Sequence, residues 1–159
     1  MRRPYSIRDV NAIIEKALGA FPLIGLGCDL ITGFPGESIL DFLATKQLLV
    51  KYPFSNVHVF AYSERPGTPA ANMPGKLPKE IRKSRAHEIS KLAEQNRKRY
   101  LKRFIGRKVE FVIEDDKKMT GWSGEYFPCM LDLKTCSKIP RRKDLVSATV
   151  TSAKDGVLT

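Results

Sequence analysis

The amino-acid sequence predicts an α/β unit followed by an all-β unit, with a long basic helix between them. Helix-type and strand-type segments alternate over about the first 70 residues with short connections, which is typical of parallel strands and crossover helices. Several short strand-type segments crowd roughly the last 50 residues, which favours a small β-barrel. The chain has 159 residues, 42% of them hydrophobic, which suits one large or two small domains.

The first two segments predict a helix and a strand. Ser6 and Asp9 have capping-box spacing, so we expect a helix to begin there and Gly19 to end it. The apolar run at residues 24–31 predicts a strand that is buried on both faces. Residues 32–38, with the sequence TGFPGES, then break the strand with a turn.

A second helix and a second strand repeat this order. The helix is expected from about residue 38 to 52, with Pro53 as its stop, and residues 57–62 form a near-continuous apolar strand. Two parallel strands cannot close a sheet or cover their own edges. We therefore expect residues 1–70 to be a piece of a larger α/β domain, such as an α/β barrel or an open sheet.

A long helix is expected after this α/β piece. Residues 63–78 are rich in proline and glycine and predict an ordered loop or linker. Pro78 suits the first position of a helix that reaches about Phe104 and ends at Gly106. The basic residues should take its outer faces, and its inward stripe should comprise Ile81, Ile89, Leu92, Ala93, Tyr100, Leu101 and Phe104.

The last part of the chain is expected to be rich in strands. Residues 108–114 alternate apolar and polar side chains, which predicts a half-buried strand. A turn should follow at residues 115–118. Further signals for strands and a final turn lie, in order, at residues 124–131, 145–151 and 155–156.

The net charge of +11 is concentrated in one stretch of the sequence. Residues 76–109 hold 13 basic side chains and only 3 acidic ones. A solvated helix face explains such a run, and contact with a polyanion explains it equally well, so both interpretations stay open. If a polyanion is bound, the side chains expected to contact its phosphates are Arg97, Arg99, Lys102, Arg103, Arg107 and Lys108.

The composition argues against several classes of protein and site. The apolar runs are far shorter than the roughly 20 residues that cross a bilayer, and the N-terminus does not resemble a secretory signal. Three scattered cysteines argue against a disulfide framework and against a zinc or iron–sulfur site, and they favour the cytoplasm. They are Cys28, Cys129 and Cys136. His58 and His87 have no partner at ligand spacing and are expected to be structural.

Two loops follow the ends of the expected parallel strands. Gly33 and Gly36 in the first loop would let the backbone approach a ligand and leave amides free at a helix start, although the geometry of the connection alone also explains glycine there. The second loop, residues 62–68, lies at the strand end where α/β folds bind ligands. In the β-rich part, three aromatic residues suit either base stacking or core packing: Trp122, Tyr126 and Phe127.

Three motifs together point to a known family. They are DLITGFPGE at residues 29–37, HVFAYSERPGTPA at 58–70 and FIGRKVEF at 104–111. On these motifs the chain resembles the C-terminal part of the radical S-adenosylmethionine methylthiotransferases that modify tRNA, over nearly its whole length and more loosely after residue 111. The second motif is most similar to the subgroup that acts on threonylcarbamoyladenosine next to the anticodon. Residues 1–5, MRRPY, look like the family segment that precedes a barrel helix.

The resemblance implies an architecture, a reaction and a set of contacts. Residues 1–78 would be the last part of the radical domain's partial α/β barrel, 79–106 a basic connecting helix, and 107–159 a TRAM domain, which is a small RNA-binding β-barrel. The family inserts a methylthio group at C2 of a modified adenosine in tRNA and uses S-adenosylmethionine and [4Fe–4S] clusters. The expected contacts to S-adenosylmethionine are Gly33, Gly36, Glu37, Phe60, Tyr62 and Arg65.

The chain departs from the family in its cysteines. The cluster motif Cys-x3-Cys-x2-Cys does not occur, and the N-terminal sulfur domain has no counterpart here. We therefore expect this chain to be inactive alone and to depend on the missing cluster-bearing domains. Residues 132–144 also fit the TRAM pattern poorly. Two alternatives stay open: a non-catalytic RNA-binding module, and a part of the related enzymes that modify a ribosomal protein.

Overall fold

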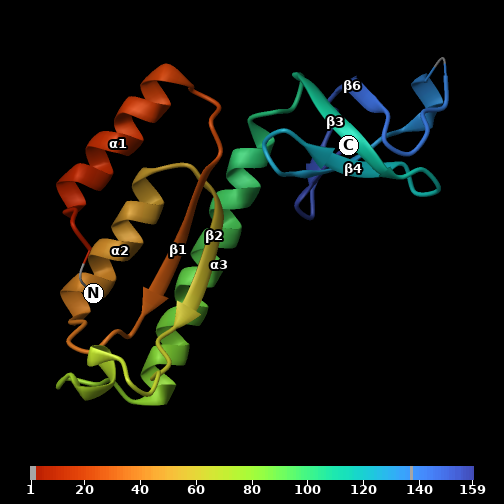
Figure 1. The fold of residues 1–159 in the computed structure, drawn as a ribbon. Coiled ribbons are helices and arrows are strands. Elements are labelled where there is room, and N and C mark those ends of the chain that lie inside the picture. Colours follow the sequence, from red (N-terminus) through yellow and green to blue (C-terminus); the bar gives the residue numbers. More distant parts are fainter. Residues whose placement is uncertain (1–2, 137) are drawn as a thin grey trace. The chain divides into compact units, whose positions relative to one another are not determined.

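The computed structural model describes residues 3–136 and 138–159 (Figure 1). The chain divides into two compact units, Met1–Asn96 and Arg97–Thr159, each with its own hydrophobic core. The first unit is α/β and the second is built mainly of strands, which confirms the predicted fold class. Residues 1–2, which begin the MRRPY segment, lie outside the described part of the chain.

The first unit alternates helices with parallel strands, as predicted. Strands β1 and β2 run parallel, with Asp29 opposite His58 and Ile31 opposite Phe60. Two glycine- and proline-rich connections flank the short 3-10 helix η1. The elements in chain order are α1 (Ile7–Ala20), β1 (Leu26–Thr32), α2 (Ile39–Lys51), β2 (Phe54–Ala61), η1 (Pro69–Asn72) and most of α3 (Lys79–Lys102).

Helices α1 and α2 both begin with a capping box. The hydroxyl of Ser6 accepts a hydrogen bond from the N–H of Asp9 at 3.4 Å, and the Asp9 carboxylate accepts one from the N–H of Ser6 at 2.7 Å. Ser38 and Asp41 repeat this arrangement at the start of α2. These bonds satisfy amides that a helix start leaves free, so both helices begin where the sequence predicts.

The core of the first unit lies on one face of the β1–β2 sheet. Inward side chains of the two strands, such as Leu30 and Val59, pack against residues from all three helices. Because the helices supply most of the buried surface, the sheet is held by them and not by further strands. The buried members of this core are Ile14, Phe42, Leu49, Tyr52, Phe54 and Ile89.

The opposite face of this sheet is exposed, which corrects a prediction. Residues 24–31 do not form a strand buried on both faces: along β1, partly buried positions alternate with exposed ones, and Ile31 is 41% exposed. Phe60, its partner on β2, is 53% exposed. The reason is that α1, α2 and α3 all pack on the side that carries Cys28 and Leu30. An apolar composition therefore overstated the burial of this strand.

The second unit contains one mixed sheet of six strands in the order β6-β3-β4-β5-β8-β7. A single strand over residues 124–131 is not observed. Tyr126, with φ of 61°, and Gly124 form a turn there, so the chain reverses between two short strands. The elements are the last turns of α3, β3 (Lys108–Asp115), β4 (Thr120–Ser123), β5 (Pro128–Met130), the 3-10 helix η2 (Leu133–Thr135), β6 (Leu145–Thr149), β7 (Ala153–Lys154) and β8 (Val157–Leu158).

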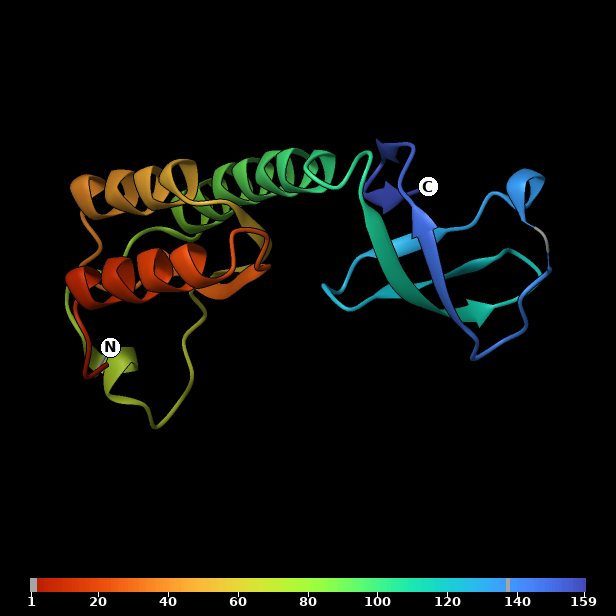
Figure 2. The same cartoon turned by 90° about the horizontal axis from the view of Figure 1, so that it is seen from above.

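The sheet of the second unit is strongly curved (Figure 2). Within residues 3–136 and 138–159 no ladder of hydrogen bonds joins β6 to β7, so a closed barrel is not formed where the sequence predicts a small one. Hydrogen bonds continue the β7–β8 hairpin beyond the two short strands: the N–H of Thr151 donates to the carbonyl of Thr159 at 2.7 Å, and the N–H of Thr159 donates to that of Ser152 at 3.0 Å. The predicted turn at Asp155-Gly156 is confirmed between β7 and β8.

The second core fills the concave side of this sheet. Strand β3 alternates exposed and buried residues as predicted, and the last turns of α3 pack against its buried side. The rings of Tyr100 and Phe127 lie 5.2 Å apart at their centroids. The buried members are Tyr100, Leu101, Phe104, Val109, Phe111, Ile113, Phe127, Cys129, Val150 and Leu158. The end of α3 therefore belongs to the core of the β-rich unit.

Candidate functional site

The loop after β1, predicted to contact S-adenosylmethionine, has its polar groups engaged within the chain. Gly33 and Gly36 both have left-handed backbone, with φ of 72° and 86°. The N–H of Gly33 donates to the Glu37 carboxylate at 2.8 Å, and the N–H of Gly36 donates to the carbonyl of Gly75 at 3.0 Å. The amides of these two glycines are therefore engaged within the chain. Both amides hold the loop in its shape.

The close approach at Gly33 is made by a helix. A Cβ atom at this position would lie 2.4 Å from Cγ and 3.0 Å from Cβ of Arg82, on the first turn of α3. Arg82 donates from Nη1 to the carbonyl of Tyr62 at 2.8 Å, and its own carbonyl accepts from the Thr32 hydroxyl at 3.4 Å. Glycine at position 33 thus allows α3 to pack on the ends of β1 and β2.

A second arginine of α3 secures the same loop. Arg85 forms an ion pair with Glu37, and both side chains are only 12% exposed. The guanidinium also donates to the carbonyls of Glu37 at 3.3 Å and Ser38 at 3.4 Å. The prediction that basic residues take only the outer faces of this helix is therefore wrong for Arg82 and Arg85. Conversely Ile81, expected in the inward stripe, is 44% exposed.

The remaining residues assigned to this site lie in different surroundings. The Tyr62 ring packs edge-on against Phe34 at 5.3 Å, with the Arg82 guanidinium 5.8 Å from its centroid. Its hydroxyl is buried and has no hydrogen-bond partner among the described residues. Phe60 is 53% exposed, and Arg65 lies in an exposed loop that the Thr68 hydroxyl secures by donating to the Arg65 carbonyl at 2.8 Å. The structure joins Gly33, Glu37 and Tyr62 through α3 and leaves Phe60 and Arg65 in solvent.

The cysteines do not fit an iron–sulfur cluster. Cys28 belongs to the first unit, whereas Cys129 and Cys136 belong to the second. Burial raises the pKa of Cys28 and of Cys129 to about 11, which opposes the thiolate form that a cluster needs. Over the described part of the chain, no group of three or more His, Cys, Asp or Glu side chains is placed to hold a metal ion.

The basic residues at the end of α3 form one region, which we call the helix-end cluster. It comprises Arg97, Arg99, Lys102, Arg103, Arg107 and Lys108. All are exposed except Arg97, whose guanidinium lies 5.3 Å from the Phe127 ring centroid and whose pKa is lowered by burial. Arg107 donates from Nε to the main-chain carbonyl of Arg103 at 3.1 Å, and the Arg103 guanidinium lies 5.7 Å from the Tyr100 ring centroid. Arg97 is thus a packing residue as much as a cation.

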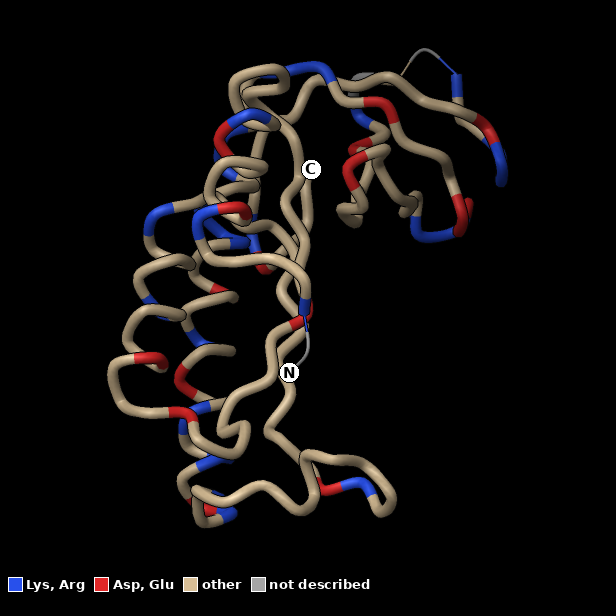
Figure 3. Tube along the Cα trace, turned by 60° about the vertical axis from the view of Figure 1, so that its left-hand side comes forward, with Lys and Arg blue, Asp and Glu red and all other residues tan. Residues whose placement is uncertain are grey.

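Charge is distributed along both units (Figure 3). In the described residues, no helix is long and apolar enough to cross a membrane.

The three aromatic residues of the β-rich part differ in their surroundings. Phe127 is buried and packs in the core, whereas Trp122 is 45% and Tyr126 79% exposed, as base stacking would require. Sequence reasoning did not separate these roles, because a turn interrupts the alternation at Tyr126.

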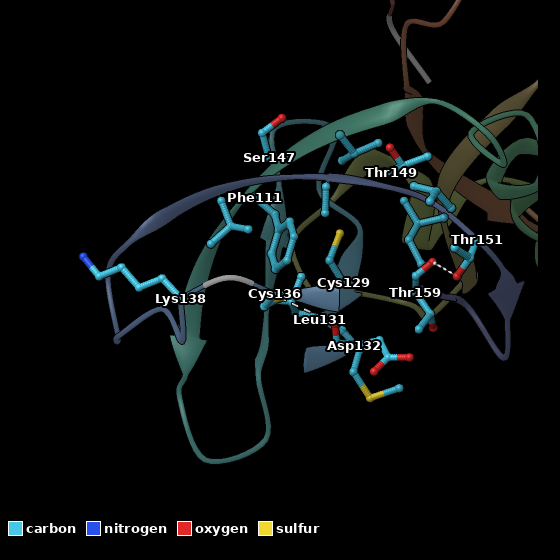
Figure 4. Close-up of a pocket in the computed structure, with 16 residues that line it drawn as sticks. Phe111, Cys129, Leu131, Asp132, Cys136, Lys138, Ser147, Thr149, Thr151 and Thr159 are labelled. Carbon is cyan, nitrogen blue, oxygen red and sulfur yellow. Dashed lines mark hydrogen bonds between the residues drawn. The ribbon is translucent and has the colours of Figure 1, made fainter. Parts of the chain in front are cut away.

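A pocket of about 520 Å³ opens on the concave side of the second sheet (Figure 4). Its lining is largely apolar, from Val109, Phe111 and Leu131 among others, and Lys138 extends away from the other side chains. The thiols of Cys129 and Cys136 donate to backbone carbonyls at 3.6 Å. Both cysteine side chains of the pocket lining are therefore engaged with the backbone.

No family model matches this chain. It is 39% identical over 114 residues to the threonylcarbamoyladenosine tRNA methylthiotransferase MtaB of Thermotoga maritima, which covers 72% of this chain and 26% of that protein. It is 32% identical over 161 aligned positions to the tRNA-2-methylthio-N(6)-dimethylallyladenosine synthase of Arthrobacter sp., covering 96% of this chain and 31% of that protein.

These similarities are to one part of proteins that are named as methylthiotransferases of tRNA or as synthases of methylthio-adenosines in tRNA. A further relative is the tRNA-2-methylthio-N(6)-dimethylallyladenosine synthase of Nocardioides sp. The chain is 38% identical to it over 115 residues, which is 72% of this chain and 23% of that protein. The chain spans about a quarter to a third of the length of the curated relatives it matches. Identity does not separate the two named substrates, since it is 39% to MtaB and 38% to this synthase.

Proposed function

We propose that this chain is part of a tRNA methylthiotransferase and that it serves in binding tRNA. The observation that carries the proposal is the extent of the similarity, which reaches 96% of the chain and so includes both units. The helix-end cluster supports it, because its five exposed cations, which lie between residues 99 and 108, suit contact with a phosphate backbone. The reaction, methylthio transfer to C2 of threonylcarbamoyladenosine in the cytoplasm, is part of the proposal.

The two units have different proposed tasks. Residues 1–78, which lie within the first unit, are proposed to be the end of a partial α/β barrel, and S-adenosylmethionine contacts are proposed at the strand ends. There Gly36, Phe60 and Arg65 are exposed, while Gly33 and Glu37 support the loop from within. The second unit is proposed as the TRAM-like RNA-binding part. This chain supplies no cluster ligands, so it is proposed to be inactive alone.

The RNA-binding part of the proposal is tested by a salt titration. Binding of tRNA to the chain is measured over a range of roughly 50 to 300 mM salt for the wild type and for a variant with Arg99, Lys102 and Arg103 changed to Gln. The slope of log K against log salt is negative, and each phosphate that is no longer neutralised should reduce its magnitude by roughly 0.7 to 0.9. The matched control, which also removes three positive charges, changes Arg8 and Lys16 on α1 and Lys51 on α2 to Gln. An affinity and slope equal to those of the control would show that the helix-end cluster is only solvated.

The substrate and the dependence on other domains have their own tests. Anticodon stem-loops with and without the threonylcarbamoyl group should differ in affinity, and equal binding would remove this substrate from the proposal. Anaerobic treatment with iron and sulfide should give no stoichiometric cluster absorbance; a tightly held [4Fe–4S] centre would contradict the expected inactivity. Preferential binding to a ribosomal protein would favour that alternative substrate.

A non-catalytic RNA-binding module is the second candidate function. It is favoured by the second unit having its own core and sheet. The two candidates differ over the first unit, since a binding module has no use for ligand-type loops at two strand ends. Calorimetry with S-adenosylmethionine on an intact relative, with the position that matches Gly36 or Phe60 changed, separates them. Unchanged binding would favour the module.

A further inference from the structure

A second group of cations gathers at the far end of β3. Two segments distant in sequence meet there: the β3–β4 turn and the loop before β6. The N–H of Lys143 donates to the carbonyl of Ile113 at 2.7 Å, and the N–H of Arg142 donates to the Asp116 carboxylate at 3.4 Å. We call this group the loop cluster; its exposed members are Lys117, Lys118, Arg141, Arg142 and Lys143.

The acidic residues of these segments are used by the backbone. The Asp115 carboxylate accepts from the N–H groups of Lys117 and Lys118, both at 3.0 Å, and the bond from Lys118 is the main cause that lowers the pKa of Asp115. Asp144 accepts from the N–H of Arg141 at 2.8 Å. None of the four ion pairs found among the described residues includes a member of the loop cluster. The cationic heads therefore face solvent while the carboxylates shape the turns.

An apolar row on the convex face of the sheet lies beside this cluster. Leu145, Val112 and Trp122 are directly paired across β6, β3 and β4, and they are 66%, 41% and 45% exposed. The row lies about three residues, or roughly 10 Å, from the turn that carries Lys117. An indole with one open face beside a group of cations suits a base stacked on the ring and phosphates at the cations.

We infer that the loop cluster and Trp122 bind single-stranded RNA, as a second contact surface separate from the helix-end cluster. The two clusters lie at opposite ends of β3, which spans roughly 25 Å over its eight residues. Glu110 and Glu114 are exposed on the same strand as Val112, so phosphates belong over the loops and not over the middle of the sheet. The choice of RNA as the ligand rests on the proposed function, whereas the surface itself is defined by the contacts and exposures given above.

The test uses Trp122 as its own reporter, because it is the chain's only tryptophan. Poly(U) or an anticodon-loop RNA should quench its fluorescence on binding. Trp122→Ala should weaken single-stranded binding about tenfold, measured by anisotropy of labelled RNA, and leave the salt slope unchanged since stacking releases no counterions. The double variants K117Q/K118Q and R142Q/K143Q should instead lower the slope by roughly 0.7 for each phosphate that is no longer neutralised.

The matched control is R8Q/K16Q, which removes the same charge from α1. E110Q should tighten binding, because it removes a nearby negative charge. Circular dichroism confirms that each variant is folded; Lys117 and Arg142 are suitable because their structural bonds are made by backbone N–H groups.

The outcomes separate two failures. If the wild-type chain binds no RNA at low salt, the proposed RNA-binding function fails. If it binds but both double variants behave as the control and Trp122 is not quenched, only this inference is overturned. Displacement of RNA by poly-glutamate at equal charge, without a change in Trp122 fluorescence, would assign the cluster to an acidic polypeptide instead and would also overturn it.

Discussion

At the scale of single residues, Gly33 and Gly36 share a left-handed backbone but differ in what surrounds them. A side chain at Gly33 would collide with Arg82, whereas a Cβ at Gly36 meets nothing within 4 Å. The first glycine is required for helix packing and for its backbone angle, and the second only for its backbone angle. The difference can be measured because both positions belong to the same loop.

We predict that Gly33→Ala destabilises the first unit more than Gly36→Ala. The backbone cost alone is about 1 kcal/mol at either position, and overpacking adds about 1–3 kcal/mol at Gly33. Urea unfolding followed by helical circular dichroism gives both values. Equal losses would mean that Arg82 moves aside without cost.

The polar contacts of α3 are the main finding at the scale of elements. Arg82 and Arg85 bind the end of β2 and the loop after β1, across 20 and 48 residues of sequence respectively. The N-terminal end of this strongly basic helix is thereby attached through Arg82 and Arg85, whose side chains are partly buried. The net charge of this stretch therefore overstates the charge available to a polyanion.

We predict that Arg85→Gln costs about 3 kcal/mol or more of stability, because it leaves the nearly buried Glu37 carboxylate without its partner. Lys51→Gln is the matched control, since Lys51 and Glu15 form an exposed pair and its loss should leave the unfolding midpoint nearly unchanged. Helical circular dichroism during urea unfolding measures both. A loss for Arg85→Gln as small as the control's would show that solvent replaces the pair.

Strand β3 offers a matched pair in the second unit. Phe111 is 4% exposed in the core, whereas its neighbour Val112 is 41% exposed on the opposite face. We predict that Phe111→Ala costs about 3–5 kcal/mol and that Val112→Ala costs far less. Trp122 fluorescence during urea unfolding reports on this unit, because the residue lies in β4. Similar losses for the two variants would contradict the assigned facing of the strand.

At the scale of the whole molecule, the half-buried thiol of Cys28 and the buried thiol of Cys129 couple stability to alkaline pH. Burial raises the pKa of Cys28 and Cys129 to about 11, from a usual value of 9.0. Above pH 9 the unfolded thiols lose their protons while the native ones keep them. The unfolded state therefore binds fewer protons, and stability is full below about pH 9 and falls as the pH rises toward 11.

We predict that a C28A/C129A variant loses this part of the pH dependence. The comparison is the slope of unfolding free energy against pH between 9 and 11, not the absolute stability, which the cavities also lower. The Cys136→Ala variant serves as the control with one thiol removed elsewhere. Identical slopes for all three proteins would show that neither buried thiol titrates differently on unfolding.

The sequence by itself determined the order of helices and strands in the first unit, the starts of α1 and α2, the alternation of β3 and the position of the basic stretch. Capping boxes and side-chain periodicity act between near neighbours, so they can be seen in a linear chain. Only the tertiary structure decided that Arg82 and Arg85 face inward, that Ile31 and Phe60 are exposed, and that the loop cluster exists. Each of these features depends on which segments, distant in the sequence, pack against each other. Neither apolar composition nor local net charge contains that information.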